Sequence, residues 1–203
     1  MYLLTAVPLD ISRPTCNTSY RNKSLDWSTH VLDIARNASR AYGALRRAAP
    51  FLSEAARLTV YKSIIRPQME YASPVWSNCS EHALNALDTI ERRCSKLFPS
   101  LAVGDSLSHR RKIADLAVYH SILHRNAPPI ISDLAPPLAA RPCNTRQATN
   151  LHPLAVQIPT SKTEHHKKSF MPGMARMFNA LPTNIATIAS QQQFKINCNA
   201  FLR

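Results

Sequence analysis

The chain has 203 residues, a length that fits one or two domains, and 45% of them are hydrophobic. Its 3 glycines against 15 prolines argue against a hairpin-rich β architecture and predict a mainly α fold with helices bounded by prolines. The 25 lysines and arginines exceed the 12 acidic residues and give a net charge of +13, which favours polyanionic partners.

Residues 1–24 are expected to form an irregular leader without a helical period. Their apolar start lacks a basic segment and is interrupted by Pro8 and Asp10, so it is a poor signal peptide. No window approaches 18 apolar residues, so neither a transmembrane helix nor a membrane partner is expected. The five cysteines are widely spaced and are expected to be reduced thiols, which predicts an intracellular protein, nuclear or cytoplasmic.

Residues 25–100 are predicted to form a small helical bundle. The first helix follows Asp26, ends at Pro50 and carries one apolar stripe: Val31, Ala35, Ala38, Tyr42, Leu45 and Ala49. The second begins after Ser53 and is expected to end or kink at Pro67, and the third begins after Ser80 and ends at Pro99. Between them, Tyr71 and Trp76 are expected to form a small aromatic core beside Pro74, with base stacking as the alternative.

The second half divides into three segments. Residues 101–125 are predicted to hold a basic helix, from about Ser106 to His124. Residues 126–160 are rich in proline and are predicted to be an extended connector that docks locally, with a helical turn near 130–134. Residues 161–203 are predicted to be a helical C-terminal region, with Pro172 at the first position of one helix and Phe194, Cys198 and Phe201 in the last.

The chain shows no motif for catalysis. It has no adjacent aspartates and no acid-x-acid motif that could hold the two metal ions of a polymerase. A serine with His120 and Asp115 could be drawn as a hydrolase site, but no G-x-S-x-G elbow supports it. There is also no glycine-rich phosphate loop and no metal-ligand spacing of cysteines. We therefore expect no enzymatic activity, no cofactor, no metal and no small-molecule substrate.

Basic clusters are the candidate functional residues, because cationic side chains on helices can contact a nucleic-acid backbone without reading its sequence. The alternative for each cluster is a solvated helix face or helix end. The candidates for backbone contact are Arg36, Arg40, Arg46, Arg47, Arg92, Arg93, Arg110, Arg111 and Lys112. A further cluster lies at 162–168.

Several motifs, spread in order over residues 25–203, carry a family resemblance. They include L-D-W-S-T-H at 25–30, G-A-L-R-R at 43–47, R-P at 66–67, E-Y-A at 70–72, P-V-W at 74–76, R-R at 110–111, S-F-M-P at 169–172 and F-N-A-L-P at 178–182. This order resembles the region that follows the palm in reverse transcriptases of non-LTR retrotransposons, particularly the jockey-like lineages. The sequence departs from the family at Phe178, where tryptophan is usual, and at Glu91, where glutamine is usual.

The resemblance implies a thumb-like helical subdomain that clamps the template–primer duplex, followed by a small helical C-terminal domain. Its implied partners are RNA or an RNA–DNA hybrid, and the palm and fingers of the same polymerase. The paired catalytic aspartates of the palm have no counterpart in these residues, so the implied piece is a truncated, non-catalytic one. Two alternatives remain open: a helical protein–protein interaction module, and a gene-model fragment without a selected function.

Overall fold

The structure is a computed structural model that describes residues 26–97, 105–139 and 152–203. These residues form a mainly α fold, as the sequence predicts, and the only β interaction within them is an isolated bridge between Leu138 and Val156. The leader at 1–24, the helix stop expected at Pro99, and Cys16 and Cys143 lie outside the described residues.

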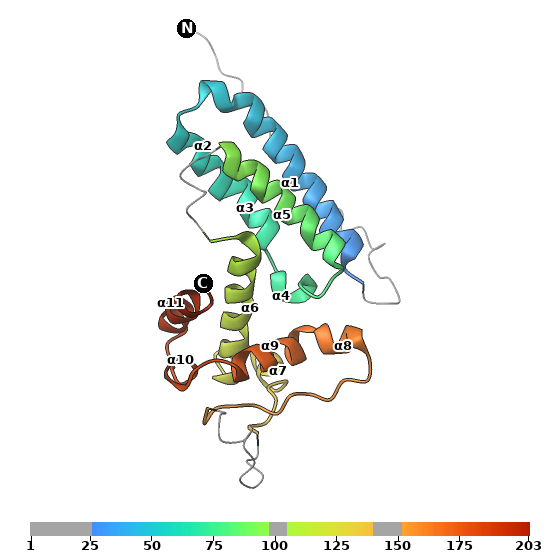
Figure 1. Cartoon of the computed structure of the whole chain (residues 1–203), viewed down its shortest axis with the longest axis vertical. Helices are drawn as coiled ribbons and strands as arrows, with labels where there is room; N and C mark the ends of the chain where they lie inside the picture. Colours follow the sequence, from blue (N-terminus) through green and yellow to red (C-terminus); the bar gives the residue numbers. More distant parts are fainter. Residues whose placement is uncertain (1–25, 98–104, 140–151) are drawn as a thin grey trace.

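Two groups of helices lie one above the other along the long axis, and α6 (Leu107–Leu123) joins them (Figure 1). The upper group consists of α1 (Ser28–Ala48), η2 (Ala49–Phe51), α2 (Glu54–Val60), η3 (Tyr61–Ile65), α3 (Arg66–Glu70), α4 (Ser73–Trp76) and α5 (Glu81–Leu97). The lower group consists of α7 (Pro129–Ser132), α8 (Glu164–Lys168), α9 (Phe170–Asn179), α10 (Thr183–Ala186) and α11 (Gln191–Phe201).

The first helix follows the predicted apolar stripe. Val31, Ala35, Ala38 and Leu45 are buried, and they recur at the spacing of one helix face. At the start of α1, the Asp26 carboxylate accepts hydrogen bonds from the Ser28 backbone N–H at 2.9 Å and from its hydroxyl at 2.6 Å. These bonds satisfy a backbone donor that has no partner within the helix. The α-helix ends at Ala48, and Pro50 lies in the short 3₁₀ turn that follows.

The helical path does not end at Pro67, although a distortion occurs there. The α-helical turns of α2 widen into the π-helical η3, and α3 then continues from Arg66 to Glu70 with Pro67 as its second residue. A proline inside a helix has no N–H and excludes the carbonyl four residues before it. The π turn accommodates that mismatch, so the chain runs one turn further than a proline stop allows.

The turn after α3 separates the two aromatic residues that were expected to pack together. Trp76 is 1% exposed, and its Nε1 donates a 2.9 Å hydrogen bond to the Tyr71 carbonyl. Ala72 has φ of 55°, in the left-handed region, and directs the Tyr71 side chain outward so that it is 80% exposed. The expectation of a shared aromatic core is therefore right for Trp76 and wrong for Tyr71.

Helices α1 and α5 run side by side in the same direction (Figure 1). Their starts are tied together, because the Ser28 Oγ lies 2.9 Å from the Ser80 Oγ and accepts a 3.2 Å hydrogen bond from the Ser80 N–H. Buried apolar side chains of these helices and of η3, α3 and α4 form the first core: Val31, Ala35, Ala38, Leu45, Tyr61, Ile65, Met69, Trp76, Ala83, Leu87, Ile90, Cys94 and, from α6, Leu107.

Helix α6 contributes to two cores at once. It begins one residue after the predicted Ser106, whose hydroxyl accepts a 3.3 Å hydrogen bond from the His109 N–H as an N-cap. Leu107 belongs to the first core, whereas Leu116 and Tyr119 belong to a second one in the lower group. The helix is therefore buried on several sides, unlike the amphipathic α1 and α5.

The second core lies between α6, α9, α10 and α11. Its main members are Tyr119, Phe178 and Phe194, and the Tyr119 and Phe178 rings meet edge to face at 5.8 Å. Helix α9 starts at Phe170, two residues before the expected position. Pro172 is tolerated because N–H groups in the first turn have no partner within the helix.

The described parts of the proline-rich segment contact the lower group of helices. Its short helix α7 lies at Pro129–Ser132. Further along, Asn179 exchanges two hydrogen bonds with the backbone of Val156, at 2.9 Å and 2.8 Å. The His152 Nε2 donates to the Phe178 carbonyl at 2.9 Å. These contacts fix residues 152–156 against α9.

Candidate nucleic-acid interface

One side of α1 is basic from the middle of the helix to its carboxyl end. Arg36, Arg40 and Arg47 recur at spacings of four and seven, so they lie on one face, opposite the buried stripe. Gly43 lies in the same row, and a β-carbon added to it would meet only the Arg47 Nη1, at 3.7 Å. Arg46 is exposed beside this row. Four arginines therefore project from the solvent side of one helix.

The last turns of α5 carry a second set of exposed cations: Arg92, Arg93 and Lys96. Because α5 starts level with α1 and runs in the same direction, its carboxyl end lies at the same end of the upper group as the carboxyl end of α1 (Figure 1). The partial negative charge of the two helix ends favours cations there. The fold thus places six of the nine candidate residues, and Lys96 in addition, on the middle and carboxyl-terminal part of α1 and on the last turns of α5.

Most of these cations are not neutralised by neighbouring acids. Arg36 forms an ion pair with Asp33. The Arg40 Nη1 lies 3.4 Å from the Asn37 side-chain oxygen, and the Arg92 Nη2 donates to the Thr89 hydroxyl at 2.9 Å. Among the described residues, Arg40, Arg46, Arg47, Arg92, Arg93 and Lys96 form no ion pair. Their charges remain available to an anion in solution.

Arg110 lies inside the molecule. Its side chain is 15% exposed and forms ion pairs with Glu70 at 2.6 Å and with Glu91 at 2.7 Å. Burial disfavours the charged guanidinium, but the hydrogen bond to Glu70 and the charges of Glu91 and Glu70 outweigh it and raise the pKa of Arg110. This residue joins α6 to α3 and α5 and is not presented to an external backbone.

Arg111 is more deeply buried, with its side chain 6% exposed. Its Nη2 lies 2.9 Å from the Asp88 carboxylate, and its guanidinium carbon lies 5.8 Å from the centre of the Trp76 ring, a cation–π contact. Lys112, the next residue, is exposed, but it is on α6 and outside the arginine group of α1 and α5. The structure therefore separates these three candidates from the other six.

Asp115 and His120, the two α6 residues that could be drawn as part of a hydrolase site, are also buried. The Asp115 carboxylate accepts a 2.6 Å hydrogen bond from the Ser73 hydroxyl, and burial raises the pKa of Asp115. His120 instead donates from Nε2 to the Ile188 carbonyl at 2.6 Å. Asp115 and His120 thus point to different partners and do not form the relay that a Ser-His-Asp site requires.

Across 26–97, 105–139 and 152–203, no three His, Cys, Asp or Glu side chains come together in a way that could hold a metal ion. Of the helices in those ranges, none has the length and apolar character needed to cross a bilayer. Cys79, Cys94 and Cys198 are free thiols.

Comparison of the chain with protein-family models, with curated proteins and with solved structures found no match.

Proposed function

We propose that this chain binds the phosphate backbone of nucleic acid, in particular an RNA–DNA hybrid, through the carboxyl ends of α1 and α5. The observation that carries the proposal is the group of exposed cations that runs from the middle of α1 to its carboxyl end and over the last turns of α5: Arg36, Arg40, Arg46, Arg47, Arg92, Arg93 and Lys96. We call this group the basic end. Arg110 and Arg111 are left out because they are held in internal ion pairs.

The chemistry of the basic end suits phosphate better than it suits a protein anion site. Guanidinium groups donate paired N–H bonds that match phosphate oxygens, and long exposed side chains adapt to the position of a duplex. Gly43 leaves the middle of the α1 row without a side chain, which lets a strand approach the helix closely. Contacts of this kind fix a duplex in place without reading its sequence.

The resemblance in the sequence supports a more specific form of the proposal. We propose that the chain is the thumb and C-terminal part of a non-LTR retrotransposon reverse transcriptase, without catalytic activity of its own. In that role it would act beside a palm and fingers that carry the active site. It would be found in the nucleus or cytoplasm, where retroelement RNA is copied.

The test is the affinity for a short RNA–DNA hybrid measured across a salt series. A triple variant, Arg40→Gln with Arg47→Gln and Arg93→Gln, removes three exposed charges that form no ion pair with any residue of the described ranges. Each lost phosphate contact makes the slope of log affinity against log salt shallower by about 1. We therefore expect weaker binding and a slope shallower by about 2 to 3.

The matched control is Lys162→Gln with Lys168→Gln and Lys195→Gln. These lysines are also exposed and form no ion pair among the described residues, so the net charge falls by the same amount in the lower half of the molecule. We expect this control to change the slope much less. Equal effects of the two triple variants would reject the basic end as the site, and salt-independent binding would reject the proposal.

A second candidate function, a protein–protein interaction module, is favoured by one observation. Exposed apolar side chains lie close together along the chain in and after α7: Ile130, Ile131, Leu134 and Leu138. An exposed apolar patch of this kind marks contact with another protein. Sedimentation at high salt tests this second candidate. Self-association of the wild type that is lost in an Ile130→Ser variant, together with no affinity for the hybrid, would favour it.

A further inference from the structure

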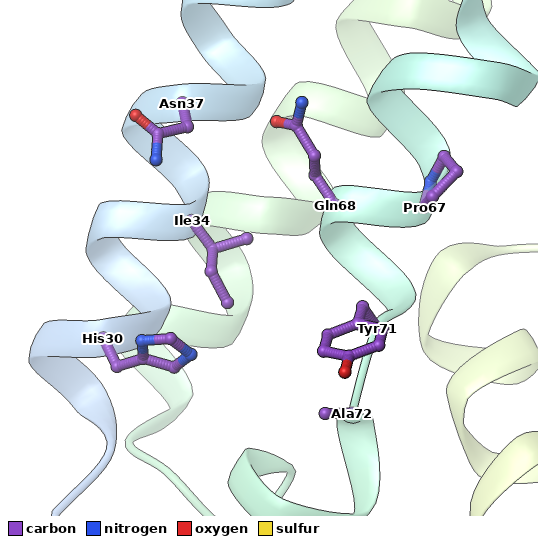
Figure 2. A pocket seen from close by; sticks show the side chains of 7 residues that line it. All are labelled: His30, Ile34, Asn37, Pro67, Gln68, Tyr71 and Ala72. Carbon is purple, nitrogen blue, oxygen red and sulfur yellow. The ribbon is translucent and has the colours of Figure 1, made fainter. Parts of the chain in front are cut away.

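An apolar groove runs along the upper group, between α1 and α3. Its volume is about 620 Å³, and it is lined by His30, Ile34, Asn37, Pro67, Gln68, Tyr71 and Ala72. Figure 2 shows that α1 supplies one wall and α3 with its following turn supplies the other. A cleft of this size, mostly apolar with a few polar groups, is typical of sites for flat organic ligands.

Two rings lie on opposite sides of the groove at one end. The His30 ring comes from the first turn of α1 and meets the Trp27 ring edge to face at 5.8 Å. The Tyr71 ring comes from the other wall (Figure 2). Between them, Ile34 projects from α1 and supplies an aliphatic surface. Rings on opposite sides of a groove offer stacking surfaces to a planar ligand.

The position of Tyr71 is fixed by its backbone and not by packing of its side chain. The Tyr71 carbonyl accepts the hydrogen bond from Trp76, the Tyr71 N–H donates to the Pro67 carbonyl at 2.9 Å, and Ala72 adopts the left-handed conformation. A left-handed alanine is energetically unfavourable, and such strain occurs preferentially at binding sites. The turn therefore holds an exposed aromatic ring at the edge of the groove.

Carboxamide groups lie towards the other end. Asn37 and Gln68 can each donate and accept hydrogen bonds, as the edge of a nucleobase does. The Gln68 Oε1 is shielded from solvent and has no hydrogen-bond partner among the described residues. A buried acceptor without a hydrogen bond costs free energy. A small rotation of this amide towards an N–H group of a ligand in the groove would remove that cost.

The groove adjoins the basic end. Arg40 contacts the groove-lining Asn37, and Arg36 and Arg47 lie on the same row as Arg40. An occupant with flat apolar faces and anionic links would place its faces in the groove and its charges on these arginines. A polynucleotide has both properties, whereas an apolar peptide would leave the arginines without anions.

We propose that this groove receives an unpaired base of a single-stranded nucleic acid, stacked on Tyr71, while phosphates further along the same strand contact Arg40 and Arg47. This inference rests on the proposed function and adds a ligand class to it: a single strand whose base has left the stack. In a fully paired hybrid the bases are stacked on one another, so the groove would not be used.

The test compares an RNA oligonucleotide with an abasic version of the same length, which keeps every phosphate and lacks the bases. We expect the wild-type protein to bind the abasic strand about tenfold more weakly, since stacking on an aromatic side chain contributes roughly that much per base. Tyr71→Ala should bind both strands with equal, low affinity, and Tyr71→Phe should restore the preference. Because Tyr71 is mostly exposed, these variants should unfold at the same temperature as the wild type, which is measured in parallel.

The outcomes separate the two proposals. If Tyr71→Ala keeps the wild-type preference for bases over abasic sites, the groove inference is wrong, while salt-dependent hybrid binding through the arginines still stands. If neither strand nor the hybrid binds, the proposed function itself fails. If Tyr71→Ala abolishes a self-association of the protein and leaves strand affinity unchanged, the groove is a protein contact and the inference is overturned.

Discussion

At the scale of single residues, His120 is a titratable side chain that folding removes from solvent. It is fully buried, its Nε2 donates to the Ile188 carbonyl, and its Nδ1 has no hydrogen-bond partner among the described residues. Its ring stacks on Phe194 at 4.2 Å and lies 4.1 Å from the His124 ring. Burial lowers the pKa of His120, the hydrogen bond to Ile188 opposes this shift, and the charge of His124 adds to it.

This environment predicts that the protein loses stability in mild acid. A histidine whose pKa is lowered on folding binds its proton more readily in the unfolded chain, so stability is complete above about pH 6.5 and falls below it. One such group changes the free energy of unfolding by at most about 2 kcal/mol between pH 6.5 and pH 5. In His120→Phe, urea unfolding should depend less on pH over this interval, whereas the exposed control His166→Phe should keep the wild-type dependence. If the free energy of unfolding depends on pH equally in wild type and His120→Phe, burial of His120 is not the cause of the acid sensitivity.

At the scale of elements, the ion pairs of α6 fix it to the upper group. Arg110 links it to Glu70 of α3 and Glu91 of α5, and Arg111 links it to Asp88 of α5. Glu91 also accepts a 2.5 Å hydrogen bond from the Leu107 N–H at the start of α6. These partners lie 16 to 40 positions apart in the chain. The bonds therefore connect different helices and do not merely stabilise one turn of α6.

We therefore predict that Arg111→Met destabilises the fold. The methionine keeps the contact with Trp76 but leaves the partly buried Asp88 carboxylate without its partner, which costs about 2–3 kcal/mol. Arg47→Met is the matched control, because the same substitution on the exposed row of α1 should change the free energy of unfolding by no more than about 0.5 kcal/mol. Denaturant unfolding measures both, and an equal cost at the two sites would mean that Arg111 is not a structural residue.

The same elements show what the sequence could predict. The apolar periods of α1 and α5 and the cap at Ser106 predicted helices close to those observed, because each signal is local. The burial of Arg110 and Arg111 could not be read in this way, since their acidic partners belong to other helices. Tyr71 was misjudged because its exposure depends on one left-handed residue, Ala72, that is not a glycine. The basic end could not be predicted from the sequence, because it depends on the parallel arrangement of α1 and α5, and local sequence patterns do not indicate how two helices pack.

At the scale of the whole molecule, α6 is shared by two apolar cores. The first core takes Leu107 from its start, and the second takes Leu116 and Tyr119 from its middle. A helix needs tertiary packing to be stable in water, so loss of either core removes support from α6. We infer that the two groups of helices unfold together, despite their separate cores.

The two tryptophans make this coupling measurable, because Trp27 and Trp76 both belong to the upper group. Phe194→Ala creates a cavity in the second core, where Phe194 is 0% exposed, and should cost about 3–5 kcal/mol. With coupled unfolding, tryptophan fluorescence and helical circular dichroism should lose stability by the same amount, although the substitution lies in the other core. Phe201→Ala, on the same helix but 51% exposed, should shift both signals only slightly. If the tryptophan transition of Phe194→Ala stays at the wild-type midpoint while the circular dichroism becomes biphasic, the two groups fold independently, and α6 is a linker between them.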